Sequence, residues 1–345
     1  MSPRVAFVFP GQGEKRVDVA LRAALRTELG RELCEMASEA SGAPLRLLET
    51  RPDLLDRQMV YQAMMTALSL SAAEALSRAG VRPSVVMGHS LGELAAWAAG
   101  GAFSPRKAIR LAALRGRLMG REAGSNPGGM VALSTGDGAA IKAALAEGGS
   151  RGRLCVAAYN APDEVVLSGD EPAIRGGAVV CAGDRDARPD AGPVAQPGHE
   201  AHRLRDGVPF SPGGPGAAPV RLRAEPHRRA VPRRPAGRVA RALQLARSPD
   251  SSFAGPAALT GVAGSPVPGL VDAAGTSICR RSSRSSSCDR CRGAKCVRSL
   301  LGLADIVVMM GPTAVLRSLW HRNVRAEVAS GARSSGDLPV LYSTG

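Results

Sequence analysis

Aromatic residues are scarce in this chain of 345 residues, where phenylalanine, tryptophan and tyrosine together make up 3%. A folded core must therefore be aliphatic, although the chain is long enough for one large domain or two smaller ones. No run of about 18 apolar residues occurs, so no membrane span is expected. The N-terminus lacks the basic and long apolar segments of a secretory signal, and the seven cysteines are an odd number. Both features favour a reduced, cytoplasmic protein.

Charge of one sign dominates, with a formal net charge of +15 at pH 7. An excess of this size often indicates a nucleic acid or an anionic surface as partner. It is unevenly distributed, because residues 176–300 contain 20 Arg and Lys against 9 Asp and Glu, a net of +11 that leaves +4 for all the rest. The basic character therefore belongs to one segment.

Residues 176–300 also contain 14 of the 25 prolines, no tryptophan and no tyrosine, and their apolar residues follow no regular period. This composition is typical of disordered or low-complexity protein. Two explanations stand: a genuine basic linker, or out-of-frame translation of a GC-rich gene. We favour the second, because a structureless insert of this length inside a compact domain is improbable.

The rest of the chain has the composition and the pattern of apolar residues of an ordinary α/β protein. Apolar runs predict strands at 4–10, 83–88, 129–135, 154–160 and 164–169, and helical spacing predicts helices at 17–40, 56–79, 90–101, 104–124 and 139–149. Ser104 and Pro105 are suited to the start of the fourth helix. A strand, a Gly-Pro turn and another helix follow at 300–323. This order predicts a parallel sheet with helices, together with a small strand-helix-strand-strand unit.

A serine lies between two glycines in Gly88-His89-Ser90-Leu91-Gly92, after the strand at 83–88 and before a helix. Glycines on both sides permit the tight strand-to-helix turn that exposes a nucleophilic hydroxyl, and the helix N-terminus favours negative charge there. We interpret Ser90 as a nucleophile; the alternative is an ordinary helix N-cap.

Four ordered motifs, "FPGQG" from Phe9, "GHSLGE" from Gly88, "LRGRLM" around Arg115 and "YNAPDEVVLSG" around Asn160, resemble the malonyl-CoA:acyl carrier protein transacylases. That family includes the acyltransferase domains of polyketide synthases. The resemblance covers residues 4–174, and more weakly 300–323 through "GPTAVLRSL". It implies an α/β fold: a hydrolase-like core with a parallel sheet and an inserted small ferredoxin-like subdomain.

The implied domain boundaries are 1–124 and about 196–323 for the large α/β subdomain, 125–195 for the small subdomain, and 324–345 for a C-terminal tail. The implied reaction moves a malonyl or related acyl group from coenzyme A to an acyl carrier protein, in fatty acid or polyketide synthesis. Acyl-CoA is the substrate, and no metal or other cofactor is needed. Met1 just before the first motif favours a free-standing enzyme over a synthase fragment.

The resemblance also implies roles for single residues. Ser90 would form an acyl ester, and the backbone N–H groups of Leu91 and Gln12 would form an oxyanion hole. Arg115 would hold the free carboxylate of a malonyl group, which suits a planar and permanently charged guanidinium; the alternative is a solvated arginine. Asn160 would order the site, with a plain loop residue as its alternative.

His89 adjoins the nucleophile in sequence, and the resemblance implies that it lines the site. It is a poor candidate base, because neighbouring side chains in a tight turn point in different directions. A serine nucleophile nevertheless needs a base, usually histidine.

The family places that base just before a Ser-Pro pair, yet here "DGVPFSPGG" has Phe210 directly before Ser211. His199 lies 109 residues after Ser90, close to the family's separation, but without the motif. We name His199 as the candidate base, ahead of His202, and a chain without a working base remains open. That alternative is a catalytically impaired acyltransferase-like protein, acting if at all as a basic interaction module.

Four cysteines, at 279, 288, 291 and 296, lie among arginines and include one Cys-x2-Cys pair. Such a pair can form half of a zinc site, and basic flanks suit nucleic acid. A second pair and interleaved aromatic residues are both missing from the sequence there. We therefore expect neither a zinc site nor a nucleic-acid partner, and no membrane association.

Overall fold

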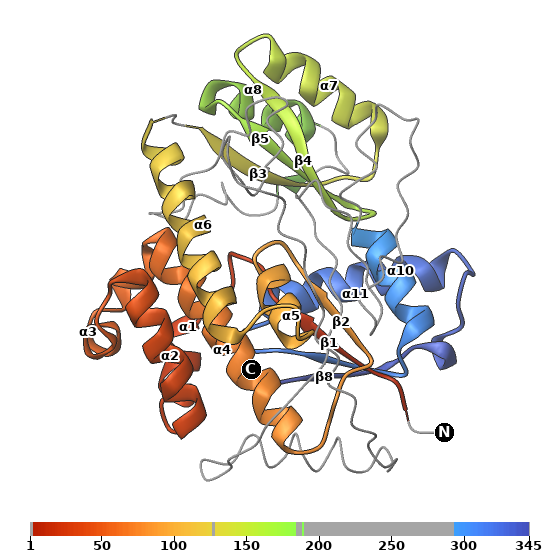
Figure 1. Cartoon of the computed structure of the whole chain (residues 1–345). Coiled ribbons are helices and arrows are strands. Elements are labelled where there is room, and N and C mark those ends of the chain that lie inside the picture. The colour runs from red at the N-terminus through yellow and green to blue at the C-terminus, as the bar shows by residue number, and fades with distance from the viewer. Residues whose placement is uncertain (1–2, 126–127, 184–187, 190–292, 345) are drawn as a thin grey trace, which may run out of the picture.

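The computed structural model describes residues 3–125, 128–183, 188–189 and 293–344. These residues form two four-stranded sheets, each accompanied by its own helices (Figure 1). We call the part built around the parallel sheet the large subdomain and the part built around the other sheet the small subdomain.

The sheet of the large subdomain is parallel and has the strand order β2-β1-β7-β8. Its strands are β1 (Val5–Phe9), β2 (Val85–Gly88), β7 (Ile306–Met309) and β8 (Val340–Ser343). The first three are buried along their whole length, as expected for continuous apolar runs in a parallel sheet covered on both faces. Phe9 lies opposite Gly88, so the loops that follow β1 and β2 leave the same edge of the sheet.

Helices of the large subdomain surround this sheet (Figure 1). They are α1 (Val17–Ala24), α2 (Glu28–Ser41), α3 (Leu45–Thr50), η1 (Pro52–Asp56), α4 (Gln58–Arg78), α5 (Gly92–Ala99), α6 (Pro105–Ser125), α10 (Gly293–Leu303), α11 (Ala314–Ala329) and η2 (Ser335–Asp337). In α4, 16 of 21 residues are buried, so it is a core helix. α6 begins as predicted, with Ser104 Oγ accepting from the backbone N–H of Lys107.

The small subdomain has the element order strand, helix, two strands, helix, strand. Its elements are β3 (Gly129–Ser134), α7 (Gly138–Gly149), β4 (Leu154–Ala161), β5 (Glu164–Gly169), α8 (Glu171–Gly183) and β6 (Arg188–Pro189). The sheet is antiparallel with order β4-β5-β3-β6, and it has a separate apolar core that includes Leu133, Ile141 and Leu167. The predicted fold class, a parallel α/β core with an inserted small subdomain, is confirmed.

Three sequence-based expectations need correction. The helix predicted over 17–40 is interrupted after α1, because Thr27 adopts an extended backbone and caps α2 by accepting from the Gly30 N–H at 3.0 Å. Residues 300–303, predicted to begin a strand, instead form the end of helix α10 (Gly293–Leu303).

Residues 324–345, predicted as a tail, instead contain the end of α11 and the edge strand β8. β8 satisfies the open edge of β7, with Ile306 opposite Val340 and Met309 opposite Ser343. The backbone N–H of Gly311 then donates to Thr344 Oγ1 at 2.8 Å. Residues 340–343 therefore belong to the parallel sheet of the large subdomain.

Candidate active site

Ser90 occupies the sharp turn between β2 and α5. Its φ is 52°, and among the described residues Arg16 is the only other non-glycine residue with positive φ. An L-residue adopts this left-handed conformation at some energetic cost, which is typically retained where function requires it. The geometry confirms the predicted strand-turn-helix context of the Gly-x-Ser-x-Gly motif.

Close backbone approach explains both glycines of the motif. A Cβ atom on Gly88 would lie 2.3 Å from the backbone nitrogen of Glu93, and one on Gly92 would lie 2.4 Å from the carbonyl oxygen of Phe9. Both distances are far below van der Waals contact, and neither backbone can yield easily. The glycines therefore allow α5 to start directly against the ends of β1 and β2.

Arg115, to which the resemblance assigns the substrate carboxylate, reaches Ser90 from α6. Its Nη2 donates to Ser90 Oγ at 3.2 Å, and its Nη1 donates to Gln62 Oε1 at 2.7 Å. Helices α6 and α4 come close at this point because Gly116 of α6 has no side chain. A Cβ there would lie 2.4 Å from the carbonyl oxygen of Gln58 in α4. Burial lowers the pKa of Arg115, and the charge of Glu93 opposes that shift; a guanidinium nevertheless stays protonated in proteins.

Three glutamines form a hydrogen-bonded cluster behind Arg115. Gln12 donates from Nε2 to Gln58 Oε1 at 2.8 Å, and Gln62 donates from Nε2 to Gln12 Oε1 and to Gln58 Oε1, both at 3.1 Å. Gln12 was predicted at the site, whereas Gln58 and Gln62 were not. Their only sequence signal is a pair of amides four residues apart in the mostly apolar stretch that becomes α4.

Gln12 and Leu91, the residues assigned to the oxyanion hole by resemblance, lie at the same edge of the sheet. Gln12 belongs to the loop after β1, and Leu91 directly precedes the first residue of α5. N–H groups at the start of a helix carry a partial positive charge. These positions suit N–H donors to an oxyanion. The oxyanion-hole role of Gln12 and Leu91 stays a proposal.

His89 packs against the loop after β1. Its backbone N–H donates to the carbonyl oxygen of Phe9 at 2.9 Å, and a Cβ on Gly11 would lie 2.4 Å from the imidazole Nδ1. The imidazole Nε2 lies 3.4 Å from Asn160 Oδ1. Burial lowers the pKa of His89, and the hydrogen bond with Asn160 partly offsets this, so the ring is neutral at pH 7.

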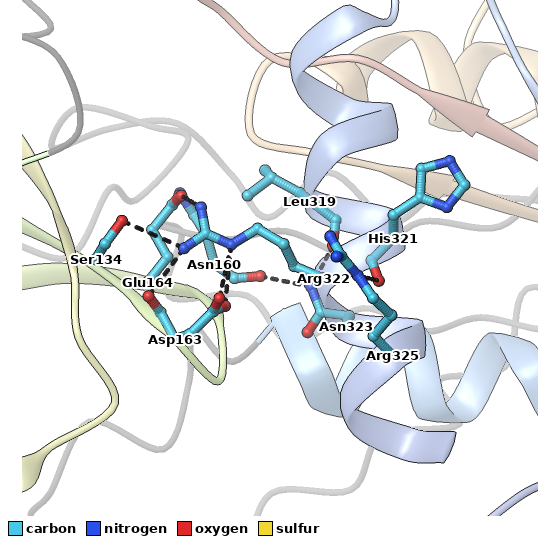
Figure 2. A network of polar contacts seen from close by, with 9 residues as sticks. All are labelled: Ser134, Asn160, Asp163, Glu164, Leu319, His321, Arg322, Asn323 and Arg325. Atoms are coloured by element: carbon cyan, nitrogen blue, oxygen red, sulfur yellow. Dashed lines mark hydrogen bonds and ion pairs between the residues drawn. The ribbon is translucent and has the colours of Figure 1, made fainter. Parts of the chain in front are cut away.

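Asn160, at the end of β4, brings the small subdomain to His89. Its Nδ2 donates to Glu164 Oε1 at 3.0 Å, and its backbone oxygen accepts from Asn323 Nδ2 of α11 at 2.8 Å. Figure 2 shows Asn160, Glu164 and Asn323 between the two subdomains, with Arg322 of α11 directed at the turn between β4 and β5. Asn160 is therefore a contact point between subdomains as well as a neighbour of the nucleophile turn.

Glu93 is a further titratable group at the site that the sequence did not single out. Burial raises its pKa to about 7, against the opposing effects of a hydrogen bond from Trp97 and the charge of Arg115. It follows Ser90 by three residues, in the first turn of α5.

The candidate bases His199 and His202, and also His227, lie outside the described residues. His321 is described, on the exposed side of α11. Of the four clustered cysteines, Cys296 lies in α10 and the other three are outside the described ranges. Within those ranges, no group of three or more His, Cys, Asp or Glu side chains could hold a metal ion. No helix found there is sufficiently long and apolar to cross a bilayer.

About half of this chain matches a known protein family. Residues 6–177 match the model of the acyl transferase domain family. Erythronolide synthase EryA3 of Saccharopolyspora erythraea is 36% identical over 204 residues, 57% of this chain and 6% of that protein. The hybrid PKS-NRPS synthetase pytA of Aspergillus terreus is 37% identical over 186 residues, 50% of this chain and 28% of that protein. The chain thus spans only a small part of these relatives.

Solved structures show the same fold. The acyl-carrier-protein S-malonyltransferase of Burkholderia pseudomallei aligns with a TM-score of 0.63 at 24% identity, over 99% of this chain and 96% of that one. The acyltransferase domain from the second module of the salinomycin polyketide synthase aligns with a TM-score of 0.60, also at 24% identity, over 99% of this chain and 69% of that one.

Proposed function

Because this chain belongs to the acyl transferase domain family, we propose that it moves an acyl group from coenzyme A to the phosphopantetheine thiol of an acyl carrier protein. The observation that carries the proposal is the contact between Arg115 Nη2 and Ser90 Oγ at 3.2 Å, at a serine held in the left-handed conformation. It places a cation beside the hydroxyl of this turn, which suits an acyl group that bears its own carboxylate.

The proposed reaction has two half-steps through an ester on Ser90. Ser90 Oγ attacks the thioester carbonyl, an O–C bond forms and the C–S bond breaks, and the serine proton passes through a base to the departing coenzyme A thiolate. The carrier's thiol then attacks the ester carbonyl, a C–S bond forms and the C–O bond to Ser90 breaks, and the thiol proton passes through the base to Ser90 Oγ. Each tetrahedral state carries an oxyanion, for which the N–H groups of Leu91 and Gln12 are the proposed donors.

Malonyl is the proposed acyl group, and methylmalonyl or a related carboxyacyl group fits the same reasoning. A guanidinium can bind a carboxylate through two parallel hydrogen bonds. Gln62 holds the Nη1 side of Arg115 at 2.7 Å, which fixes the plane of the fork in advance. Such preorganisation lowers the cost of ordering the arginine when substrate binds.

The base is the part of the proposed site at which this sequence departs from the family pattern. His199 is the candidate, and the histidine that the family places before Ser-Pro is missing at Phe210-Ser211. That departure supports the alternative of a catalytically impaired acyltransferase-like protein. Reading the gene in all three frames through codons 170–305 separates the two: a second frame that restores Phe-His-Ser-Pro supports the enzyme, and confirmation of the present frame in the expressed protein supports impairment.

Acyl labelling tests the proposed function directly. The full chain is incubated with malonyl-CoA, and its intact mass and peptide masses are recorded. We expect a malonyl adduct on the peptide that contains Ser90, its loss in Ser90→Ala, and its retention in the control Ser84→Ala. Label that persists in Ser90→Ala contradicts the nucleophile, and a folded wild-type chain that takes up no label supports the impaired alternative.

A further inference from the structure

Arg322 of α11 links the large subdomain to the turn between β4 and β5 (Figure 2). Its Nη1 donates to Glu164 Oε2 at 2.5 Å, its Nε to the Asp163 carboxylate at 3.0 and 3.1 Å, and its Nη2 to the Asp163 carbonyl oxygen at 2.9 Å. The side chains of Arg322 and Glu164 are only 16% and 11% exposed. A charge pair so far removed from water is held in one geometry.

The ion pair fixes the orientation of the Asn160 amide. A carboxylate held by a guanidinium can only accept hydrogen bonds, so Glu164 Oε1 must face an N–H group. Asn160 Nδ2 supplies it at 3.0 Å. The amide oxygen therefore points the opposite way, toward the imidazole of His89.

That oxygen in turn determines which imidazole nitrogen carries the proton. Asn160 Oδ1 accepts hydrogen bonds and cannot donate them, so His89 Nε2, at 3.4 Å, must present an N–H. A neutral imidazole has one N–H, which leaves a lone pair on Nδ1. This nitrogen lies against the loop after β1, where Gly11 leaves room for it.

α11 is held in place by contacts other than the chain of hydrogen bonds from Arg322 through Glu164 and Asn160 to His89, which we call the relay. Glu14, in the loop after β1, accepts from the N–H groups of Val315 and Leu316 at 3.0 and 2.9 Å and so caps the start of the helix. Asn323 holds the Asn160 backbone oxygen at 2.8 Å. The helix thus controls both the backbone and the side-chain orientation of Asn160.

We propose that Arg322 is a positioning residue for the His89 imidazole. Acting through Glu164 and Asn160, it selects the tautomer with the proton on Nε2. A fixed, neutral imidazole next to the nucleophile turn adds no positive charge beside Ser90, where Arg115 Nη2 donates to the hydroxyl. The meaning of this for acyl transfer rests on the proposed function; the tautomer itself does not.

Nitrogen NMR of the full chain labelled with ¹⁵N-histidine tests the assignment. Long-range ¹H–¹⁵N correlation spectra distinguish the two neutral tautomers, and His89→Gln identifies the His89 signals by their loss. For the wild type we expect one tautomer, protonated on Nε2. A proton on Nδ1, or an even mixture of the two tautomers, overturns the proposal. This measurement on the wild type needs no substitution at Arg322 or Glu164.

Two variants test the role of the ion pair. Arg322→Gln frees Glu164, and Glu164→Gln offers Asn160 an amide that can either accept or donate. In both we expect loss of the single-tautomer pattern of His89. Arg325→Gln is the matched control, because Arg325 lies one turn further along α11, is exposed, and donates to the His321 carbonyl oxygen instead of to the small subdomain.

A wild-type pattern in folded Arg322→Gln and Glu164→Gln overturns the positioning role. Should one variant fail to fold, the other and the wild-type tautomer still decide the question. Absence of acyl label on Ser90 contradicts the proposed function and leaves these spectra unaffected. A wrong tautomer in a chain that takes up label contradicts the positioning role alone.

Discussion

The guanidinium of Arg115 donates from Nη2 to the hydroxyl of Ser90 at 3.2 Å, although the residues are 25 positions apart in sequence. α6 carries the arginine and the β2–α5 turn carries the serine. An acyl group esterified to Ser90 would therefore begin beside a fixed cation. A carboxylate at the far end of that group gains a charged partner, whereas the methyl end of an acetyl group gains none.

Replacement of Arg115 by alanine is expected to reduce malonyl transfer more than acetyl transfer. Hydrogen bonds to charged groups contribute about 1.5–3 kcal/mol, so the loss in kcat/KM for malonyl-CoA should be roughly 10- to 150-fold. Steady-state rates with the two thioesters provide the measurement. Arg117→Ala, an exposed site on the same helix, serves as control, and equal losses for both substrates in Arg115→Ala remove the carboxylate-binding role.

Gln62 is completely buried and holds the second arm of Arg115. Gln62→Leu removes an acceptor from Arg115 and a donor from Gln12 and Gln58, and loss of a hydrogen bond to a charged group costs about 1.5–3 kcal/mol. We expect a raised KM for malonyl-CoA together with a lower free energy of unfolding, measured by urea denaturation. Ser71→Ala, at another buried polar position of α4, should leave KM unchanged. An unaltered KM in folded Gln62→Leu contradicts the positioning of Arg115 by Gln62.

The contrast between Ser90 and Gln62 shows how far the sequence could predict the site. The turn at Ser90 is specified locally, by glycines two residues before and after it, so its strand-turn-helix context was predictable. Gln62 belongs to a helix that is buried on almost all sides, where no amphipathic pattern separates a site-facing position from a core-facing one.

Contacts between segments far apart in the chain are the second feature that could not be predicted from the sequence. β8 joins the sheet only because β7 offers it an open edge, and four residues of moderate polarity after the last helix give no sign of that pairing. Arg322 likewise looks like any basic residue on a helix. Its role depends on the β4–β5 turn, some 158 positions away, which periodicity and spacing cannot bring into contact with it.

Gly88→Ala tests the close packing of the nucleophile turn. The added methyl group would lie 2.3 Å from the Glu93 nitrogen, and its three nearest atoms all belong to the backbone of Gly92 and Glu93, which cannot yield easily. We expect a loss of several kcal/mol in the free energy of unfolding, beyond the roughly 1–3 kcal/mol of ordinary overpacking, or failure to fold.

Gly124→Ala on α6 is the control for this substitution. A Cβ there meets no atom within 4 Å, and alanine is preferred to glycine in a helix by roughly 1 kcal/mol. We therefore expect unchanged or slightly higher stability, again measured by urea denaturation. Equal stability of Gly88→Ala and the wild type contradicts the packing described at the turn.

Glu93 makes stability depend on pH in a direction opposite to that of most carboxylates. Its pKa rises from the ordinary value of 4.5 to about 7 in the folded protein, chiefly through burial. Between these values the folded chain retains a proton that the unfolded chain has lost, so the contribution of Glu93 to stability falls as pH rises. The shift corresponds to at most about 3 kcal/mol, reached above pH 7.

Glu93→Gln removes this titration and retains an oxygen that can accept the hydrogen bond from Trp97. Its stability relative to the wild type should therefore be unchanged near pH 4.5, rise through pH 7, and stay constant above that. Urea denaturation of both proteins between pH 4.5 and 8.5 measures the difference. Glu32→Gln on the exposed face of α2 controls for the loss of one carboxylate. A Glu93→Gln difference that does not change with pH across this range contradicts the raised pKa of Glu93.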